Sequence, residues 1–224
     1  MPQSKGVFFH MNPNDQAIHF AGTTIGKHRH ICALSYTGEQ ANRVLLPFMR
    51  DGLERGEKAL HIVDPALRDQ HLASLQAAGI DTSAEEREGH LDVRDWRDTY
   101  LRDGRFDQNR MIALVEEILQ AGHEEGYRQT RVVAHMEWAL KDVPGVNDFV
   151  EYEARLNHVL PKYVDTLICV YDCTKFRASV MMDIVRTHPL VIVGGLLQEN
   201  PFFVPPDQFL HSLRERRAHQ RNVA

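Results

Sequence analysis

The sequence contains little cysteine and no apolar run long enough to span a membrane. Its three cysteines, Cys32, Cys169 and Cys173, cannot all pair within one chain, which excludes a small disulfide-stabilised fold. The longest strongly apolar run covers residues 190–197, far short of a membrane span. The first residues lead into a polar stretch rather than the apolar core of a signal peptide. We therefore expect a protein of the reducing cytoplasm, without membrane contact, whose cysteines are free thiols or ligands.

The charge balance excludes one class of partner. The 224 residues carry 26 basic and 31 acidic side chains, a net charge of −5, so the chain has no positive excess for binding nucleic acid. Apolar residues make up 43% and charged residues 25% of the chain, which excludes intrinsic disorder and fibrous repeats. This length and composition predict one large domain with a substantial core.

Short apolar runs alternate with amphipathic segments along most of the chain. Strands are predicted at 31–36, 58–63, 91–94, 131–134, 166–171 and 190–193, after two short strands at 7–9 and 17–20. Helices are predicted at 39–55, 67–78, 110–123, 148–160, 176–187 and 205–217. This alternation is typical of an α/β fold with a mainly parallel central sheet and helices on both faces. Ligands of such folds bind beyond the carboxyl ends of the strands.

No segment has the full pattern of a phosphate-binding loop. The segment Gly22–His28 resembles one, but only three residues separate its glycines, and a histidine follows the lysine. A true loop would follow the first long strand, where Thr37–Gln40 has one glycine, no lysine and a glutamate. Because that glutamate would repel a triphosphate, we do not expect a bound nucleotide.

Metal-ligating residue types gather at the start of the first long strand. His28, His30 and Cys32 share one face if this stretch is extended, and two imidazoles with a thiolate suit zinc, copper or haem iron. The alternative is structural, with Cys32 as a buried core thiol and the histidines at the strand entrance. We favour the structural interpretation because the sequence offers no evident fourth ligand.

A second group of polar residues lies at the expected carboxyl ends of strands. His135 and Glu137 interrupt an apolar pattern directly after the fourth long strand, where parallel sheets place ligands. A structural hydrogen bond at a strand–helix junction is the alternative interpretation. Along the fifth long strand, Cys169 is predicted to be a core residue, whereas Tyr171 approaches the carboxyl end and is expected to line a pocket. His188 lies just before the last predicted strand.

Several stretches, taken in order, resemble one family, the MEDS sensory domain, named for methanogen and methylotroph sensors. They are His30–Leu34, 45–48, 52–57, Gly104–Asp107, His135–Leu140, Glu151–Asn157, Arg186–Pro189 and Glu199–Pro201. The resemblance implies a RecA-like three-layer sandwich, similar to the circadian-clock ATPases, with a degenerate phosphate loop. It divides the chain into an N-terminal extension (1–27), a MEDS-like sensory domain (28–206) and a C-terminal helix or tail (207–224).

The resemblance also implies a function, the sensing of small hydrocarbon derivatives. The family's His-x-Cys pattern falls on His30 and Cys32, and many relatives carry Gly-Glu-Met where this chain has Ala134, His135 and Met136. We therefore expect a cytoplasmic module that binds a small ligand, hydrocarbon-derived or metal-bound. It would signal as a homodimer through a partner protein such as a histidine kinase or regulator. The candidate ligand-binding residues are His30, Cys32, Tyr36, His135, Glu137, Tyr171 and His188.

Three alternatives to this interpretation stay open. One is a metal- or haem-binding redox sensor, or a metal-dependent enzyme, that uses His28, His30 and Cys32. Another is a residual nucleotide-binding ATPase, and the third is a scaffold with its interface at 202–206. The candidate cofactors are accordingly a transition metal or haem, and no residue is assigned a catalytic role.

Overall fold

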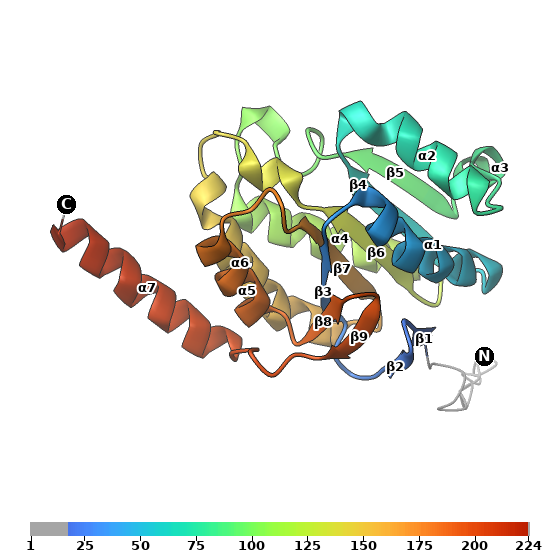
Figure 1. The fold of residues 1–224 in the computed structure, drawn as a ribbon. Helices are drawn as coiled ribbons and strands as arrows, with labels where there is room; N and C mark the ends of the chain where they lie inside the picture. Colours follow the sequence, from blue (N-terminus) through green and yellow to red (C-terminus); the bar gives the residue numbers. More distant parts are fainter. Residues whose placement is uncertain (1–17, 224) are drawn as a thin grey trace, which may run out of the picture.

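The computed structural model describes residues 18–223, which form a seven-stranded sheet with helices on both faces and a separate two-stranded hairpin (Figure 1). The strands are β1 (Ile18–Phe20), β2 (Thr23–Ile25), β3 (His30–Ser35), β4 (Lys58–Val63), β5 (Leu91–Asp95), β6 (Thr130–His135), β7 (Thr166–Asp172), β8 (Leu190–Val193) and β9 (Leu196–Glu199). The helices are α1 (Gly38–Glu54), α2 (Arg68–Ala77), α3 (Thr82–Glu88), α4 (Gln108–Glu124), α5 (Phe149–Val159), α6 (Ala178–Thr187) and α7 (Pro206–Val223).

The sheet is mainly parallel, as the sequence predicts. Its strand order is β5-β4-β6-β7-β3-β8-β9, and every neighbouring pair is parallel except β8 and β9. β9 is absent from the sequence-based prediction. It forms because Gly194 and Gly195 both adopt positive φ angles, which two-residue hairpin turns require, and so return the chain antiparallel to β8.

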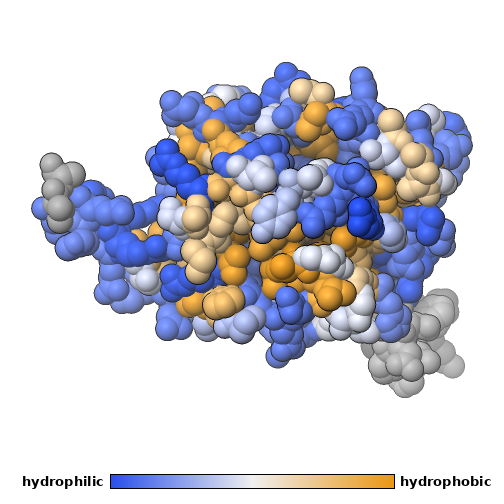
Figure 2. All heavy atoms as spheres, viewed as in Figure 1, coloured by the Kyte–Doolittle hydropathy of each residue, from blue (hydrophilic) through white to orange (hydrophobic). Residues whose placement is uncertain are grey.

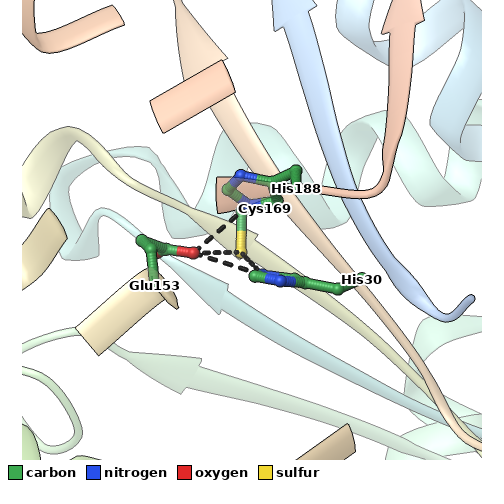
Figure 3. Close-up of side chains that lie close together, drawn as sticks. All are labelled: His30, Glu153, Cys169 and His188. Atoms are coloured by element: carbon green, nitrogen blue, oxygen red, sulfur yellow. Dashed lines mark hydrogen bonds and ion pairs between the residues drawn. The ribbon is translucent and has the colours of Figure 1, made fainter. Parts of the chain in front are cut away.

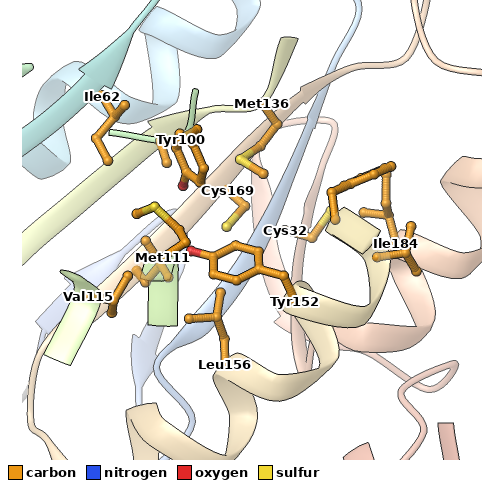
Figure 4. Packing of buried hydrophobic residues seen from close by; sticks show 14 of the residues in the cluster. Cys32, Ile62, Tyr100, Met111, Val115, Met136, Tyr152, Leu156, Cys169 and Ile184 are labelled. Carbon is orange, nitrogen blue, oxygen red and sulfur yellow. The ribbon is translucent and has the colours of Figure 1, made fainter. Parts of the chain in front are cut away.

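Alternate residues of the strands supply two separate apolar cores, one on each face of the sheet. On one face, α1 and α2 pack with the β1–β2 hairpin over residues such as Ile31 and Val133. On the other face, α4, α5, α6 and the start of α7 pack over residues such as Cys32 and Cys169. Figure 4 shows Tyr152 of α5 in this second core, close to the sheet residue Cys169.

Most predicted elements are present within one to three residues of their expected bounds, but α3 was not predicted. It is a short polar helix whose ends are set by Asp81, which accepts a hydrogen bond from the Ala84 amide, and by Gly89 in the left-handed conformation. The strand expected at 7–9 lies outside the described residues. None of the helices within residues 18–223 is long and apolar enough to cross a membrane.

α7 is attached to the body at its amino-terminal half and extends away from it, as Figure 1 shows. Phe209 and Leu213 are buried in the core beneath α5 and α6. Further along, Arg217 donates a 2.7 Å hydrogen bond to Glu151 of α5, and Arg216 donates a 3.0 Å bond to Asp183 of α6. α7 is therefore held against the body by α5 and α6.

The loop before α5 depends on the conformation of Gly145. Its φ is +84°, and a Cβ atom at this position would lie 2.1 Å from the backbone oxygen of Phe106. The Gly145→Ala substitution should therefore lower the free energy of unfolding by about 3 kcal/mol, from overpacking added to backbone strain. Chemical denaturation measures this change.

Gly126→Ala is the matched control. Gly126 also has a positive φ, +94°, but a Cβ atom would meet nothing within 4 Å. Its substitution should cost only about 1 kcal/mol of backbone strain. Equal losses of stability in the two variants would show that the contact with Phe106 does not constrain the loop.

Candidate functional site

Four side chains from distant parts of the chain converge between the sheet and α5 (Figure 3). They are His30 at the start of β3, Glu153 of α5, Cys169 in the middle of β7 and His188 directly after α6. One nitrogen, oxygen or sulfur atom from each lies within 4.8 Å of the others. All four residues are at most 1% exposed, so the group is closed to solvent.

The strand register places these groups together. β3 and β7 are neighbours, with His30 opposite Leu167 and Cys32 opposite Cys169. Because side chains alternate along a strand, His30, Cys32 and Cys169 all point to the face that α5 covers. α5 directs Glu153 at this face, and the chain turns from α6 into β8 at His188.

The Glu153 carboxylate is the centre of the group. Its Oε2 atom lies 3.2 Å from Nε2 of His30, 3.2 Å from Nε2 of His188 and 3.6 Å from Sγ of Cys169. The Cys169 Sγ atom also lies 3.7 Å from His30 Nε2, and the centroids of the two imidazole rings are 4.0 Å apart. A carboxylate, two imidazoles and a thiol at these separations are a set of groups that bind transition metals.

The Nδ1 atom of each imidazole forms a hydrogen bond with another group of the protein. His188 Nδ1 lies 2.8 Å from the carbonyl oxygen of Ile184. His30 Nδ1 lies 3.3 Å from Oδ1 of Asn157, whose amide nitrogen donates a 2.7 Å bond to the Thr187 carbonyl. Both rings are thereby oriented with Nε2 toward Glu153.

Burial determines the protonation of the neighbouring groups. It lowers the pKa of His30 to about 4, with a further lowering from His188, so this imidazole is neutral at pH 7. Burial also raises the pKa of the Cys169 thiol well above its usual range, and the nearby Glu153 charge adds to the effect. The thiol therefore carries its proton unless a cation displaces it.

A second feature, an open cleft of about 390 Å³, lies at the carboxyl ends of β4 and β6. Its walls come from the start of α1, from α2 and from the turns that follow the two strands. The lining residues are Gly38, Glu39, Asn42, Val63, Asp64, Leu67, Gln70, His71, Ser74, His135 and Glu137. This is the edge of a parallel sheet where ligands are expected.

Three histidines form a row on the α1–α2 side of the sheet and reach this cleft. His61 Nδ1 and His71 Nε2 are 2.7 Å apart, and the rings of His71 and His135 are 5.9 Å apart. Burial lowers the pKa of His71 and His135 to about 4, so both are neutral at pH 7. Burial raises the pKa of the adjacent Glu137, while Lys175 at 3.6 Å opposes this shift.

The predicted ligand-binding residues divide between these two places. His30 and His188 belong to the buried group, and the Tyr171 ring lies beside it, 6.1 Å from His188. His135 and Glu137 line the cleft. Tyr171 and His135 do not share a pocket: His135 is opposite Val170 in the register, so the side chains of His135 and Tyr171 point to opposite faces of the sheet.

The other three candidates, Cys32, His28 and Tyr36, belong neither to the buried group nor to the lining of the cleft. Cys32 is fully buried in the core beside Cys169, but its sulfur is not part of the four-residue group. His28 is exposed and precedes β3, which begins only at His30, so the common face expected for His28, His30 and Cys32 does not form. Tyr36 is 65% exposed.

Glu153 and Cys169 were not among the predicted site residues. Cys169 is buried in the core, as its position in the strand predicts, but it is also part of the group. The available signal for Glu153 was its place in α5, where it falls in the apolar stripe formed by Phe149, Tyr152 and Leu156. A carboxylate in such a stripe needs a buried partner.

The segment after β3 does not have the groups needed to hold a triphosphate. Thr37 Oγ1 accepts a hydrogen bond from the Gln40 amide, and the Tyr36 amide donates to the Gln40 side chain. Glu39 then places a carboxylate in the first turn of α1, where a phosphate-binding fold needs free amides and a lysine. The phosphate loop is degenerate.

The fold is that of RecA-like proteins. A KaiC-like protein from the archaeon Pyrococcus horikoshii OT3 matches it with a TM-score of 0.51 and 17% sequence identity, over 73% of this chain and 69% of the other. The family model of the MEDS domain, described as the methanogen/methylotroph, DcmR sensory domain, matches residues 29–189. The chain belongs to the MEDS family.

A curated relative carries the same kind of domain in a longer protein. The chain is 27% identical over 179 residues to the transcriptional repressor DcmR of Methylorubrum extorquens. The match covers 75% of this chain and 61% of the repressor, so the chain spans less than two thirds of that relative.

Acid should destabilise the protein through the row of histidines. His71 and His135 have folded-state pKa values of about 4 against an ordinary value of 6.5, so the unfolded chain binds more protons between these values. Their stabilising contribution is present above pH 6.5 and is lost as the pH falls toward 4. His135→Gln should reduce the pH dependence of unfolding in this window by up to about 1.4 kcal/mol per pH unit.

Urea denaturation at several pH values measures this slope. His28→Gln is the control, because His28 is exposed and its replacement should leave the slope unchanged. An unaltered slope in His135→Gln would contradict the assignment of a neutral buried imidazole at this position.

Proposed function

We propose that the chain is a cytoplasmic sensory module that binds a small hydrocarbon derivative in the cleft beside His135 and Glu137. The observation that carries the proposal is the open cleft at the carboxyl edge of the sheet, in a protein of a sensory family. Its volume of about 390 Å³ falls within the range of small-molecule sites.

The lining of the cleft favours a ligand with a positive charge. Three carboxylates, from Glu39, Asp64 and Glu137, line it together with the neutral imidazoles of His71 and His135, and no lysine or arginine is among its lining residues. Glu137 has Lys175 at 3.6 Å and Glu39 has Arg43 at 3.4 Å, but Asp64 has no ion pair with a basic side chain among the described residues. A small cation with apolar groups could pair with these carboxylates and contact the apolar part of the lining. We therefore infer a small alkylated amine as the ligand class.

Contacts connect the cleft to the helix that extends from the body. Glu137 precedes Trp138, whose ring is fully buried and packs 6.2 Å from the ring of Phe149 at the start of α5. α5 in turn holds α7 through the bond between Arg217 and Glu151. A ligand that moves Glu137 would change this packing, and α7 would present the change to a partner protein, such as a histidine kinase or a transcriptional regulator.

The alternatives from the sequence have less support. A haem needs a flat cavity, whereas the buried group is closed, with its ligand atoms within 4.8 Å of each other. An ATPase is disfavoured by Glu39 and by the missing lysine after β3. An enzyme is disfavoured because the thiol of Cys169, although 3.7 Å from His30 Nε2, is closed to solvent and to any substrate.

Two small probes of opposite charge test the ligand class. Trimethylammonium should bind with a Kd of about 1 mM or tighter, because a ligand with so few atoms can make only limited contact. Formate should not bind. NMR titration should place the shifts at the amides of Asn42, His71 and His135. Glu137→Gln should weaken trimethylammonium binding about fivefold or more through loss of a charged partner.

The control for this titration is Glu199→Gln, which removes an exposed carboxylate on β9 outside the cleft. It should bind trimethylammonium as the wild type does. Binding of formate equal to that of trimethylammonium, or shifts that map away from the cleft, would contradict the proposal.

We also propose that two copies of the chain associate through the region around β9. Leu196 is 64% and Phe202 is 61% exposed, and Leu196 lies on the last strand of the sheet. Figure 2 shows apolar residues gathered in the lower middle of the view, near the place where Figure 1 labels β8. Leu197 already donates a hydrogen bond to Ala21, so side-chain burial rather than strand pairing would hold the copies together.

Light scattering after size exclusion tests this association. Leu196→Ser with Phe202→Ser should convert a dimer into a monomer at micromolar concentration, because both large apolar contacts are lost. Met182→Ser is the control, since Met182 is also exposed, at 55%, but lies on α6. A wild type that is monomeric, or a Met182→Ser variant that loses the dimer to the same extent, would exclude this interface.

A further inference from the structure

We propose that His30, Glu153, Cys169 and His188 form a binding site for one divalent transition metal ion, with zinc as the best match. The site lies on the opposite face of the sheet from His135, and it does not depend on the ligand proposed for the cleft.

The first argument is the position of the proton on His188. Its Nδ1 atom is 2.8 Å from the Ile184 carbonyl oxygen, which can only accept a hydrogen bond. Nδ1 therefore carries a proton, so Nε2, which lies 3.2 Å from Glu153 Oε2, is the ring nitrogen whose lone pair a metal ion would use. This arrangement, a backbone carbonyl behind the ring, is common for metal-binding histidines.

His30 is oriented in the same way by Asn157. The amide nitrogen of Asn157 lies within 3.3 Å of three backbone carbonyl oxygens, those of Glu153, Ala154 and Thr187, so it is the donor end of the side chain. The amide oxygen consequently faces His30 Nδ1 and accepts a hydrogen bond from its N–H group. The Nε2 atom of His30 is left as a second lone pair directed at Glu153.

The Cys169 thiol donates a hydrogen bond to Glu153 Oε2, but other buried atoms of the group lack partners. Two imidazole nitrogens each lie 3.2 Å from the same carboxylate oxygen in a site that water does not reach. Within residues 18–223, neither Glu153 Oε1 nor His188 Nε2 has a hydrogen-bond partner. Buried acceptors without donors are costly, and one metal ion would satisfy the whole set.

The distances match tetrahedral zinc. Zinc binds nitrogen and oxygen at about 2.0–2.2 Å and sulfur at about 2.3 Å, which places the ligand atoms of a tetrahedron roughly 3.3–3.7 Å apart. Of the six separations among the four ligand atoms, four run from 3.2 to 3.7 Å, and all six are within 4.8 Å. Closer approach of the side chains, whose ligand atoms all lie within 4.8 Å, would admit the ion.

The charges also balance. Binding of a divalent ion would release the proton of the Cys169 thiol to solvent, leaving a thiolate beside the Glu153 carboxylate. The ion with its two anionic and two neutral ligands then has no net charge, which is favourable in a site that excludes water. Four protein ligands and no open position make the site structural rather than catalytic.

Metal analysis and cobalt titration of the full chain test the site. Purified wild type should contain about one zinc ion per chain, and the chelator-treated protein should bind about one cobalt(II) ion. The cobalt complex should show the intense visible bands of four-coordinate cobalt and a sulfur-to-cobalt charge-transfer band in the near ultraviolet. Cys169→Ser should lose the charge-transfer band.

The controls replace Cys32 and His28, the two residues of the sequence's candidate metal pattern that lie outside this site. Cys32→Ser and His28→Ala should keep the charge-transfer band and the wild-type cobalt affinity. Asn157→Ala leaves all four ligands in place and frees only the His30 ring, so it should weaken cobalt binding 10- to 100-fold. The Asn157→Ala variant therefore still tests the site if Cys169→Ser fails to fold, and circular dichroism would show such a failure.

Three results would overturn the proposal. They are a folded wild type that binds neither zinc nor cobalt, a cobalt complex without the sulfur band, and a sulfur band that Cys32→Ser abolishes while Cys169→Ser keeps it. Trimethylammonium binding is measured at the amides of the cleft, so failure of the metal site and failure of the proposed ligand site are distinguished.

Discussion

The structure depends on a carboxylate that is buried in its interior. Glu153 is 0% exposed and lies in the apolar face of α5, against the middle of the sheet. A charge in such a place is strongly destabilising unless other groups compensate it. The side chains around it come from three separate elements, because His30 belongs to β3, Cys169 to β7 and His188 to the end of α6. Docking of α5 therefore fixes two strands and a helix at the same time.

The two faces of the sheet then have different properties. The α5 side holds a closed group of ligating side chains, whereas the α1–α2 side opens into a cleft at the carboxyl ends of β4 and β6. The segment after β3 lacks the lysine and free amides of a phosphate loop, and the cleft at this edge is lined by carboxylates and neutral histidines. A site that must respond to a ligand needs access, and a site that stabilises the fold does not. α5 contacts both regions, through Glu153 and through Phe149 against Trp138.

Much of the fold could be predicted from local patterns. Apolar runs in the sequence predicted β4 and β8 at their observed bounds, because buried parallel strands are apolar on both faces. α3 was missed because it is short and buries only Thr82. β9 was missed because a pair of glycines followed by a short run predicts a flexible turn as readily as a hairpin.

The site was harder to predict, since it depends on register. Alternation correctly places His30 and Cys32 on one face, but it does not tell which strand lies beside them or which helix covers them. The pairing of Cys32 with Cys169 and the position of α5 decide that Cys169 and Glu153 join the group, and that Cys32 does not. The departures from local pattern, a carboxylate in an apolar stripe and histidines at strand ends, were the usable signals.

X-ray absorption at the zinc edge of the purified protein tests the central claim most directly, because it counts the atoms bound to the ion. The account predicts one sulfur at about 2.3 Å and three nitrogen or oxygen atoms at about 2.0–2.1 Å, from Cys169, the two histidines and Glu153. A shell of nitrogen and oxygen alone, or one with two sulfurs, would contradict it.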